Sequence, residues 1–488
     1  MRYLAFDLGA ESGRAIVGIL EDARLTLEEV YRFPNEPVRL PDGLHWDVLR
    51  LFHEMKEGLR RAVARYGTEI KSLAVDTWGV DFGLLGEKDV LLGNPYHYRD
   101  GRTQGMMEEA FKVVSREEIF QQTGIQFMPI NSLYQLLAWR QQQPAMLSQA
   151  QTLLMMPDLF NFFFTGIKAG EFTIASTTQM YNPRTGTWAT GMLEKLGLPV
   201  ALLPAINPPG TIVGPLLPRV ARETEAGEIA VIAPGSHDTA SAVAAVPAAG
   251  PDYLYISCGT WSLVGVEVKE PVINEQTLSL NFTNEGGVRG TFRLLKNVTG
   301  LWLVQECRRT WERRGEALSY AELTAMAREA NPLMAVIDPD HPAFLNPEDM
   351  PAAIQGYCRD TGQAVPQTKG EIVRCALESL ALKYRWVLEK LEGILKKQIP
   401  VIHMVGGGTQ NELLCRFTAS ATGRPVVAGP VEATAAGNLL VQAMAMGEVA
   451  DLPVAREIVH RSFALKTYEA ENTGVWEKKY ETFVKLLV

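Results

Sequence analysis

Two segments of the chain, 250 residues apart, share one pattern. Residues 3–13 read YLAFDLGAESG and residues 253–263 read YLYISCGTWSL, with Tyr, Leu, Gly and Ser at matching positions. In each, an apolar β-rich run meets a glycine turn with a hydroxyl residue, and a second β-rich run follows. This pattern predicts two β-hairpins. Hairpins can agree by chance, but each copy stands at the start of one half of the chain, which favours a duplication.

The length of the chain agrees with two halves. A chain of 488 residues exceeds what one ordinary core accommodates. We expect domains at 1–246 and 247–488, separated at the connector PAAGP (247–251). Clefts between duplicated domains are common ligand sites.

Apolar β-rich runs alternate with helical patterns along the chain. The β-rich runs include SLAVDTWGVDFGLL (72–85), EIAVIAP (228–234) and PVIHMVGG (400–407), and residues 371–395 repeat apolar positions at helical spacing. This alternation predicts an α/β fold.

Composition excludes several classes of protein. Hydrophobic residues make up 47% and charged residues 21%, which is typical of a globular protein. The net charge is −9 and no basic block occurs, so we expect no nucleic-acid partner. Asp7 interrupts the first apolar stretch, and no long uncharged apolar run follows, so we expect neither a signal peptide nor a membrane span. Five scattered cysteines without a CxxC pair predict a cytoplasmic protein.

Familiar phosphate-binding motifs are absent from the sequence. It has no GxxxxGK[ST], and the GGG at 406–408 lacks the final glycine of GxGxxG. The turns LGAESGR (8–14) and CGTWS (258–262) could form anion-binding nests of backbone N–H groups, or be ordinary hairpin turns. Three glycines in MVGGGTQNELLC (404–415) would let the backbone approach a flat ring or ribose, although a plain strand-to-helix turn is the alternative.

Asp7 stands at the end of a predicted strand, and Asp238 stands at the start of a predicted helix. Asp7 ends a buried strand and needs a partner, which is either Mg²⁺ beside phosphates or the turn amides. Asp238, in GSHDTASA (235–242), opens a small-residue helix, where it is either a cap or a base whose pKa the helix dipole lowers. Even a weak base can serve phosphoryl transfer, which depends mainly on positioning and charge neutralisation. The neighbouring His237 is either structural or a partner for sugar hydroxyls.

The sequence does not decide the role of several other side chains. Trp78 is either a core residue or a platform for a sugar ring, and the helix expected at 429–447 is interpreted as structural. No role is assigned to Asp81, Asp100, Arg99 or Arg102.

Taken together, these motifs resemble the FGGY carbohydrate kinases, and among them the branch that phosphorylates L-rhamnulose. The resemblance runs from about residue 3 to about residue 445, and its segments include AFDLGAESGR (5–14), DTWGVDFGLL (76–85), NPYHYRDGRT (94–103), TGIQFMPINSLYQL (123–136), SHDTASAV (236–243), SCGTWSLVG (257–265), NFTNEGG (281–287) and VGGGTQNELL (405–414). It implies two actin-like ATPase domains of the ribonuclease-H-like type, with the active site in the interdomain cleft. The implied reaction, in L-rhamnose catabolism, converts L-rhamnulose and MgATP into L-rhamnulose 1-phosphate and ADP.

The resemblance also implies roles for individual residues. Asp238 would be the catalytic base and Asp7 would organise Mg²⁺. The residues implied to bind the sugar, beside Asp238, are Gly79, His237, Thr239 and Asn297. The residues implied to bind ATP are Ala10, Glu11, Ser12, Gly13, Arg14, Thr260, Gln305 and Gly407. Glu11 departs from the family pattern, which has a small residue or serine there.

Three questions stay open at this level. The resemblance suggests a disulfide between Cys358 and Cys375, whereas a cytoplasmic location favours free thiols. The substrate could be L-fuculose, D-xylulose or glycerol in place of L-rhamnulose. A non-catalytic actin-like assembly module or sugar sensor is a further alternative, against which the pair Asp7 and Asp238 argues. The expected partners are a small sugar and ATP.

Overall fold

The chain folds into two compact units. The computed structural model describes residues 1–9 and 11–487. The first unit contains residues 1–249, 267–294 and 433–462, and the second contains residues 250–266, 295–432 and 463–488. The chain leaves the first unit within the 247–251 connector, but two later segments that were predicted in the second domain belong to the first unit.

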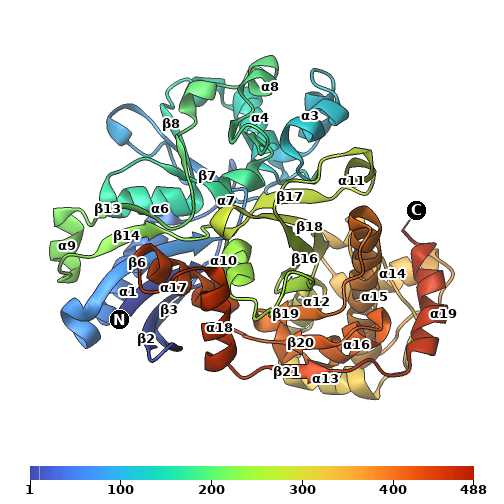
Figure 1. The fold of residues 1–488 in the computed structure, drawn as a ribbon. Coiled ribbons are helices and arrows are strands. Elements are labelled where there is room, and N and C mark those ends of the chain that lie inside the picture. Colours follow the sequence, from blue (N-terminus) through green and yellow to red (C-terminus); the bar gives the residue numbers. More distant parts are fainter. Residues whose placement is uncertain (10, 488) are drawn as a thin grey trace. The chain divides into compact units, whose positions relative to one another are not determined.

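The first unit is built on a six-stranded sheet of order β13-β14-β6-β1-β2-β3 (Figure 1). β1 pairs antiparallel with β2 and parallel with β6, and β6 pairs parallel with β14. The strands of this sheet are β1 (Arg2–Leu8), β2 (Ser12–Glu21), β3 (Arg24–Pro34), β6 (Ile70–Thr77), β13 (Thr211–Pro215) and β14 (Ala230–Ala233). The carboxyl ends of β1, β6 and β14 therefore lie at one edge of the sheet.

Helices pack on both faces of this sheet. Phe6 of β1 stacks on Phe164 of α6 (Met156–Thr165), and both belong to a core shared with α1 (Val48–Tyr66). Because side chains alternate along a strand, Asp7 faces the other side. There α17 (Ala433–Ala445) packs on β1, β6 and α10 (Asp238–Ala244), although it is far from them in sequence (Figure 1).

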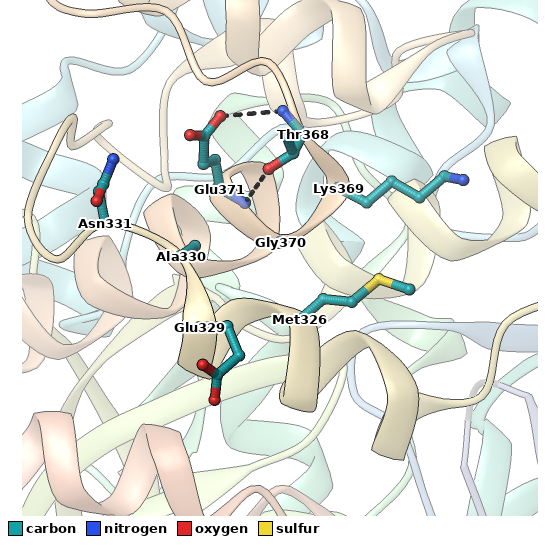
Figure 2. A pocket seen from close by; sticks show the side chains of 8 residues that line it. All are labelled: Met326, Glu329, Ala330, Asn331, Thr368, Lys369, Gly370 and Glu371. Atoms are coloured by element: carbon teal, nitrogen blue, oxygen red, sulfur yellow. Dashed lines mark hydrogen bonds between the residues drawn. The ribbon is translucent and has the colours of Figure 1, made fainter.

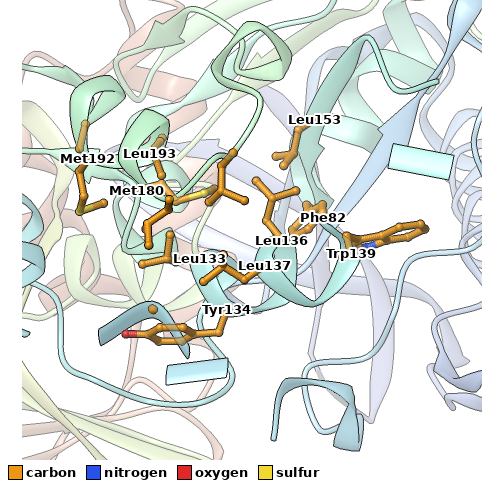
Figure 3. Packing of buried hydrophobic residues seen from close by; sticks show 14 of the residues in the cluster. Phe82, Leu133, Tyr134, Leu136, Leu137, Trp139, Leu153, Met180, Met192 and Leu193 are labelled. Atoms are coloured by element: carbon orange, nitrogen blue, oxygen red, sulfur yellow. The ribbon is translucent and has the colours of Figure 1, made fainter. Parts of the chain in front are cut away.

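A second core of the first unit is formed by buried residues between Phe82 and Leu202 (Figure 3). Leu133, Leu136 and Leu137 of α4 contribute to it, as does Phe82 of β7. The surrounding elements are β7 (Phe82–Leu85), β8 (Thr152–Met155), α2 (Met106–Phe111), α3 (Arg116–Thr123), α4 (Ser132–Gln142), α5 (Pro144–Leu147) and α8 (Thr190–Lys195). The β-rich run at 72–85 thus contains two strands, β6 and β7, which belong to different sheets.

The second unit repeats the sheet of the first. This second sheet has seven strands in the order β17-β18-β16-β15-β19-β20-β21, with β17 spanning Thr283–Gly286. β15 pairs antiparallel with β16 and parallel with β19, as β1 does with β2 and β6. The other strands of this sheet are β15 (Leu254–Cys258), β16 (Trp261–Val268), β18 (Phe292–Thr299), β19 (Ile402–Val405), β20 (Val426–Ala428) and β21 (Lys466–Tyr468). The two hairpins matched in the sequence thus occupy equivalent places, which confirms the predicted duplication of a ribonuclease-H-like α/β fold.

Long helices complete the second unit. The helix predicted at 371–395 is α15 (Lys369–Leu395), which begins with a capping box between Thr368 and Glu371. The other helices are α12 (Trp302–Arg313), α13 (Tyr320–Glu329), α14 (Met350–Asp360), α16 (Glu412–Thr422) and α19 (Thr473–Val484).

The remaining elements belong to the first unit. They are β4 (Val38–Leu40), β5 (Gly43–His45), β9 (Gly170–Glu171), β10 (Tyr181–Asn182), β11 (Thr187–Trp188), β12 (Ile206–Asn207), β17 (Thr283–Gly286), α7 (Phe172–Ala175), α9 (Pro218–Thr224), α11 (Glu275–Ser279) and α18 (Leu452–Ser462).

Among the described residues, no helix has both the length and the apolar character needed to cross a bilayer. Cys358 and Cys375 are free thiols, and a hydrogen bond from Cys375 lowers the pKa of the Cys358 thiol.

Candidate functional site

Two aspartates lie side by side at the edge of the first sheet. Asp7 near the end of β1 is the direct partner of Asp76 in β6. Residues paired across parallel strands point to the same face, so both carboxylates lie on the α17 side of the sheet. The Arg14 guanidinium contacts Asp7, with 2.5 Å between Nη2 and Oδ2. The partner of Asp7 is therefore Arg14, which was not among the alternatives considered from the sequence.

Asp76 is a candidate functional residue that the sequence did not single out. Its side chain is fully buried, and its Oδ2 accepts a hydrogen bond of 2.6 Å from Asn438 Nδ2. Its Oδ1 is also buried and accepts no hydrogen bond from any residue that the structure describes. Burial and the negative charge of Asp7 raise the pKa of Asp76 well above its ordinary value. An aspartate inside the apolar run SLAVDTWG was the available signal.

A hydrogen-bond network of two α17 side chains, Asn438 and Gln442, holds Asp76 in place. Gln442, one turn after Asn438, donates 2.7 Å to Asn438 Oδ1 and 3.0 Å to the Leu4 carbonyl, and it accepts from Ser72 Oγ at 2.7 Å. Asn438 and Gln442 are both fully buried. Buried amides this well satisfied keep a single orientation. The segment interpreted as purely structural thus also orients a carboxylate of the site.

Asp238 is the first residue of α10, and His237 is the N-cap residue without a side-chain cap hydrogen bond. The interpretation of Asp238 as the helix cap is therefore wrong. The expected lowering of its pKa is also wrong. Burial raises the pKa of Asp238, the Asp7 charge adds to the increase, and His237 and a Thr239 hydroxyl hydrogen bond of 3.0 Å only partly oppose it. The physical reason is that desolvation of the carboxylate and the nearby Asp7 charge both favour the protonated form.

The segment before α10 is anchored from two sides. The Thr77 amide of β6 donates 3.0 Å to the Ser236 carbonyl, which joins this segment to the edge where Asp7 and Asp76 lie. On the other side, Glu171 accepts from the Ser236 amide at 3.3 Å, and Thr173 accepts from the His237 amide at 3.1 Å. Asp7, Asp76 and Asp238 are brought close enough that each of the other two charges raises the pKa of Asp76.

Gly79 lies against the His237 ring. A methyl group added at Gly79 would lie 3.4 Å from both His237 Nε2 and Thr177. The next residue, Val80, has a φ of 66°, which a β-branched side chain rarely adopts. A hydrogen bond of 2.9 Å from the Asp81 amide to the Gly79 carbonyl closes this turn, and Thr177 Oγ1 accepts from the Val80 amide at 3.2 Å. Strain held in place by its surroundings is common at ligand sites.

Trp78 is a core residue. Its indole N–H donates 2.9 Å to Asp81 Oδ2, which also accepts 2.6 Å from the Trp46 indole. The two indole rings lie 4.1 Å apart, and Trp78 is buried. Burial raises the pKa of Asp81 to about 6, while these hydrogen bonds oppose the increase. Of the two alternatives for Trp78, the structure supports the core.

The first glycine turn is held by Asn35, another residue that the sequence did not single out. Its amide group donates 2.8 Å to the Gly9 carbonyl, and its backbone N–H donates 3.1 Å to the Glu11 carbonyl. A side chain at Gly13 would overlap the Phe33 ring at 2.2 Å, so this position requires glycine. Ser12 and Arg14 start β2, Glu11 is exposed, and Ala10 lies outside the described residues.

The predicted nucleotide residues gather at one edge of the second sheet. β15 and β19 are parallel neighbours, so the turn after Cys258 and the glycines after Val405 share that edge. The Thr260 carbonyl accepts from the Gly300 amide at 3.2 Å and from the Trp302 amide at 3.1 Å, which brings the start of α12 to the same turn. Gln305 lies one turn into α12, and its buried Oε1 has no hydrogen-bond partner among the described residues.

The three glycines of this edge have different surroundings. A methyl group at Gly408 would lie 2.2 Å from Cys258 Sγ, and Gly406 has a φ of 88°. A methyl group at Gly407 meets no atom within 4 Å. Gly406 and Gly408 are therefore required by packing and backbone conformation, whereas Gly407 faces open space.

This difference leads to a prediction for Gly407→Ala. If a nucleotide occupies the open space, the added methyl should raise the KM for ATP by about tenfold, which corresponds to about 1.4 kcal/mol, and leave thermal stability unchanged. A coupled assay over a range of ATP concentrations and a thermal melt measure the two effects. Gly408→Ala is the matched control, because it should lower the melting temperature. An unchanged KM in a folded Gly407→Ala variant would contradict the nucleotide assignment.

Asn297 lies on β18 in the part of that strand that belongs to the second unit. The other predicted sugar residues, Gly79, His237, Asp238 and Thr239, all belong to the first unit. The structure thus brings these four together, and Asn297 stays a prediction.

One cavity of about 480 Å³ lies in the second unit between the end of α13 and the start of α15 (Figure 2). Its lining includes Met326, Asn331, Lys369 and the capping pair Thr368 and Glu371. None of the predicted site residues lines it.

No preformed metal cage occurs in residues 1–9 and 11–487, since no three His, Cys, Asp or Glu side chains there are placed to hold an ion. Two carboxylates, Asp7 and Asp76, nevertheless lie side by side at the first sheet edge, and Asp76 Oδ1 has no hydrogen-bond partner among the described residues. Such a set suits a hard divalent cation that keeps most of its waters and binds through one or two carboxylates and a substrate.

The two sheets and their glycine turns define the class of protein. Residues 2–245 match the N-terminal domain of the FGGY family of carbohydrate kinases, and residues 254–446 match its C-terminal domain. The chain therefore belongs to the FGGY family and is a carbohydrate kinase.

Relatives carry a more specific name. A rhamnulokinase of Bacteroides thetaiotaomicron is 46% identical over 481 residues, which cover 99% of this chain and 98% of that protein. A rhamnulokinase of Bacillus subtilis is 36% identical over the full length of both chains. Among solved structures, a xylulose kinase of Lactobacillus acidophilus has a TM-score of 0.83 at 17% identity, covering 99% of this chain and 97% of that one. A glycerol kinase of Plasmodium falciparum has a TM-score of 0.79 at 15% identity, covering 100% and 97%. The structural matches show the fold, and the sequence matches agree with the predicted family.

Proposed function

We propose that the chain transfers the γ-phosphoryl group of ATP to L-rhamnulose and forms L-rhamnulose 1-phosphate. The observation that carries this proposal is the likeness to rhamnulokinases at 36–46% identity over nearly the whole chain. The arrangement of Asp238, His237 and Gly79 in one unit supports it, because a carboxylate beside a ring N–H donor suits a sugar hydroxyl.

In this proposal Asp238 accepts the proton of the attacking sugar hydroxyl. The new bond forms between that oxygen and the γ-phosphorus, and the bond from the γ-phosphorus to the bridging oxygen of ADP breaks. Thr239 holds the Asp238 carboxylate through its hydroxyl. His237 and the Gly79 backbone orient the sugar, and Asn297 contributes a further sugar contact.

Charge at the phosphates is neutralised by the first unit. The turn that contains Ser12, Gly13 and Arg14 binds phosphate oxygens through its backbone amides and the guanidinium. Asp7, with Asp76 beside it, would hold Mg²⁺, which would supply charge neutralisation for the transferred group. Thr260, Gln305 and Gly407 of the second unit bind the nucleotide. The free thiols agree with a reducing compartment, and we propose the cytoplasm.

A substrate panel tests the proposal. The protein is given ATP and Mg²⁺ with L-rhamnulose, L-fuculose, D-xylulose or glycerol, and ADP release and ³¹P spectra of the product are recorded. We expect the highest kcat/KM with L-rhamnulose and phosphate on its O1. A higher kcat/KM with another substrate would support the alternative of a different FGGY kinase. Binding of ATP and L-rhamnulose without ADP formation would support a sensor.

The pH dependence follows from the raised pKa of Asp238. Protonation removes the base, so activity is present above this pKa and lost below it. We expect kcat/KM for the sugar to fall about tenfold per pH unit on the acid side. The fall should begin at a higher pH than for an ordinary aspartate, because burial and Asp7 raise the pKa. Rates from about pH 4, the ordinary range of an aspartate, to about pH 8 test this, and tryptophan fluorescence monitors folding. A flat profile would contradict the role of Asp238.

A further inference from the structure

Two buried charged residues next to His237 have no role in the function described so far. Glu285 lies on β17 and is 4% exposed, and Arg293 lies on β18 and is 0% exposed. Both belong to the first unit, as His237 does. Burying charged groups is costly unless they are paired, so their position beside a sugar-site histidine calls for a physical reason.

The contacts connect Glu285 and Arg293, through the His237 ring, with Asp238, the proposed base. Arg293 Nη2 lies 3.1 Å from Glu285 Oε2 and 3.1 Å from His237 Nδ1, while Glu285 Oε2 lies 3.3 Å from the same Nδ1. At the other side of the ring, His237 Nε2 lies 3.4 Å from Asp238 Oδ1. Arg293 is itself fixed, since its Nε donates 2.8 Å to the Gly286 carbonyl.

This geometry selects one form of the imidazole ring. A neutral histidine carries its proton on one nitrogen only, and arginine is always a donor. If the proton were on Nδ1, the Nε2 lone pair would face the Asp238 carboxylate, which is repulsive. Glu285 Oε2, 3.3 Å from Nδ1, could accept a proton from that nitrogen, but its pairing with Arg293 and the repulsion at Nε2 oppose this form. With Arg293 donating to Nδ1, the proton is on Nε2 and points toward Asp238. Glu285 stabilises this arrangement by neutralising and orienting the guanidinium.

We propose that Glu285 and Arg293 are positioning residues that hold His237 with its Nε2–H directed at Asp238 and the sugar. His237 can then donate to the carboxylate or to a sugar oxygen, and Asp238 is held for proton transfer. The effect on turnover rests on the proposed function, whereas the form of the ring does not. Groups that fix a histidine from its far nitrogen typically change activity by about 10–100-fold in metal sites, and a similar magnitude is expected here.

The first test observes the ring directly. The protein is labelled with ¹⁵N-histidine, and His237 is assigned among the seven histidines by its loss in His237→Gln. We expect the wild type to show protonated Nε2 and unprotonated Nδ1, and Glu285→Gln to show a mixture. A wild-type His237 with its proton on Nδ1 alone would overturn the proposal, whatever the sugar substrate is.

The second test separates positioning from a merely structural role. Glu285→Gln should lower kcat/KM for the sugar about tenfold and leave the KM for ATP unchanged, whereas the exposed Glu275→Gln should change neither. In the His237→Gln background, Glu285→Gln should have no further effect, because the two residues act as one unit. If kcat/KM of the double variant fell by the product of the two single-variant losses, the proposal would be overturned. If Glu285→Gln does not fold, the wild-type spectrum decides alone.

Discussion

Replacing Asp238 by asparagine is expected to lower kcat by about 10²–10⁴-fold, the usual contribution of a general base. Asparagine keeps the size of the side chain but cannot accept the sugar proton. The Asp238 side chain is partly buried, with 32% of it exposed, so an exchange for a side chain of the same size disturbs little packing. Steady-state rates with the sugar and ATP measure the loss, and calorimetry should show that ATP still binds.

The matched control for this variant is Asp360→Asn at the exposed end of α14, which should keep wild-type rates. Turnover of Asp238→Asn within about threefold of the wild type would exclude Asp238 as the base. Loss of ATP binding together with turnover would indicate a folding defect, which a thermal melt would reveal.

Gly437→Ala is expected to have the largest effect on stability. The added methyl carbon would lie 1.7 Å from the Ser241 carbonyl oxygen and 2.6 Å from its carbon, both of which are backbone atoms of α10. Neither helix can yield without moving the other, so we expect the free energy of unfolding to fall by about 1–3 kcal/mol or more. Because α10 begins at Asp238, kcat should fall as well. Urea denaturation and steady-state rates measure the two effects.

Gly356→Ala on α14 is the matched control for Gly437→Ala. A methyl group at Gly356 meets no atom within 4 Å, so the usual preference of a helix for alanine should raise stability by up to about 1 kcal/mol. Equal effects of the two exchanges would show that α10 and α17 do not pack as closely as described.

Much of the fold could be predicted because it is local. The two glycine hairpins and the long helix from Lys369 each depend on neighbouring residues, so their periodicity is visible in the sequence. The run at 72–85 forms strands as expected, but its division into two strands is not visible in the sequence. Apolar residues continue through it, but the turn at Gly79 and Val80 is closed by Thr177, which is distant in sequence.

The residues of the candidate site also fall into a group that the sequence could identify and a group that it could not. Asp7, His237 and Asp238 could be identified because each stands beside a turn or helix start in a recognisable motif. Asp76, Asn35, Glu285 and Arg293 could not, because their importance comes from partners in other strands and helices. The direction of the pKa shift of Asp238 was also beyond the sequence, since burial and the Asp7 charge are tertiary properties.

The sequence by itself determined that the chain has two duplicated α/β halves, a glycine turn in each half and an acidic residue at the start of a short helix. These features follow from hydrophobic periodicity and turn residues, which act over a few positions. Only the tertiary structure decided that α17 returns to the first unit to hold Asp76, and that Glu285 and Arg293 meet His237. Such contacts join residues up to several hundred positions apart, and their strength depends on burial, which exists only after the sheets and helices have packed.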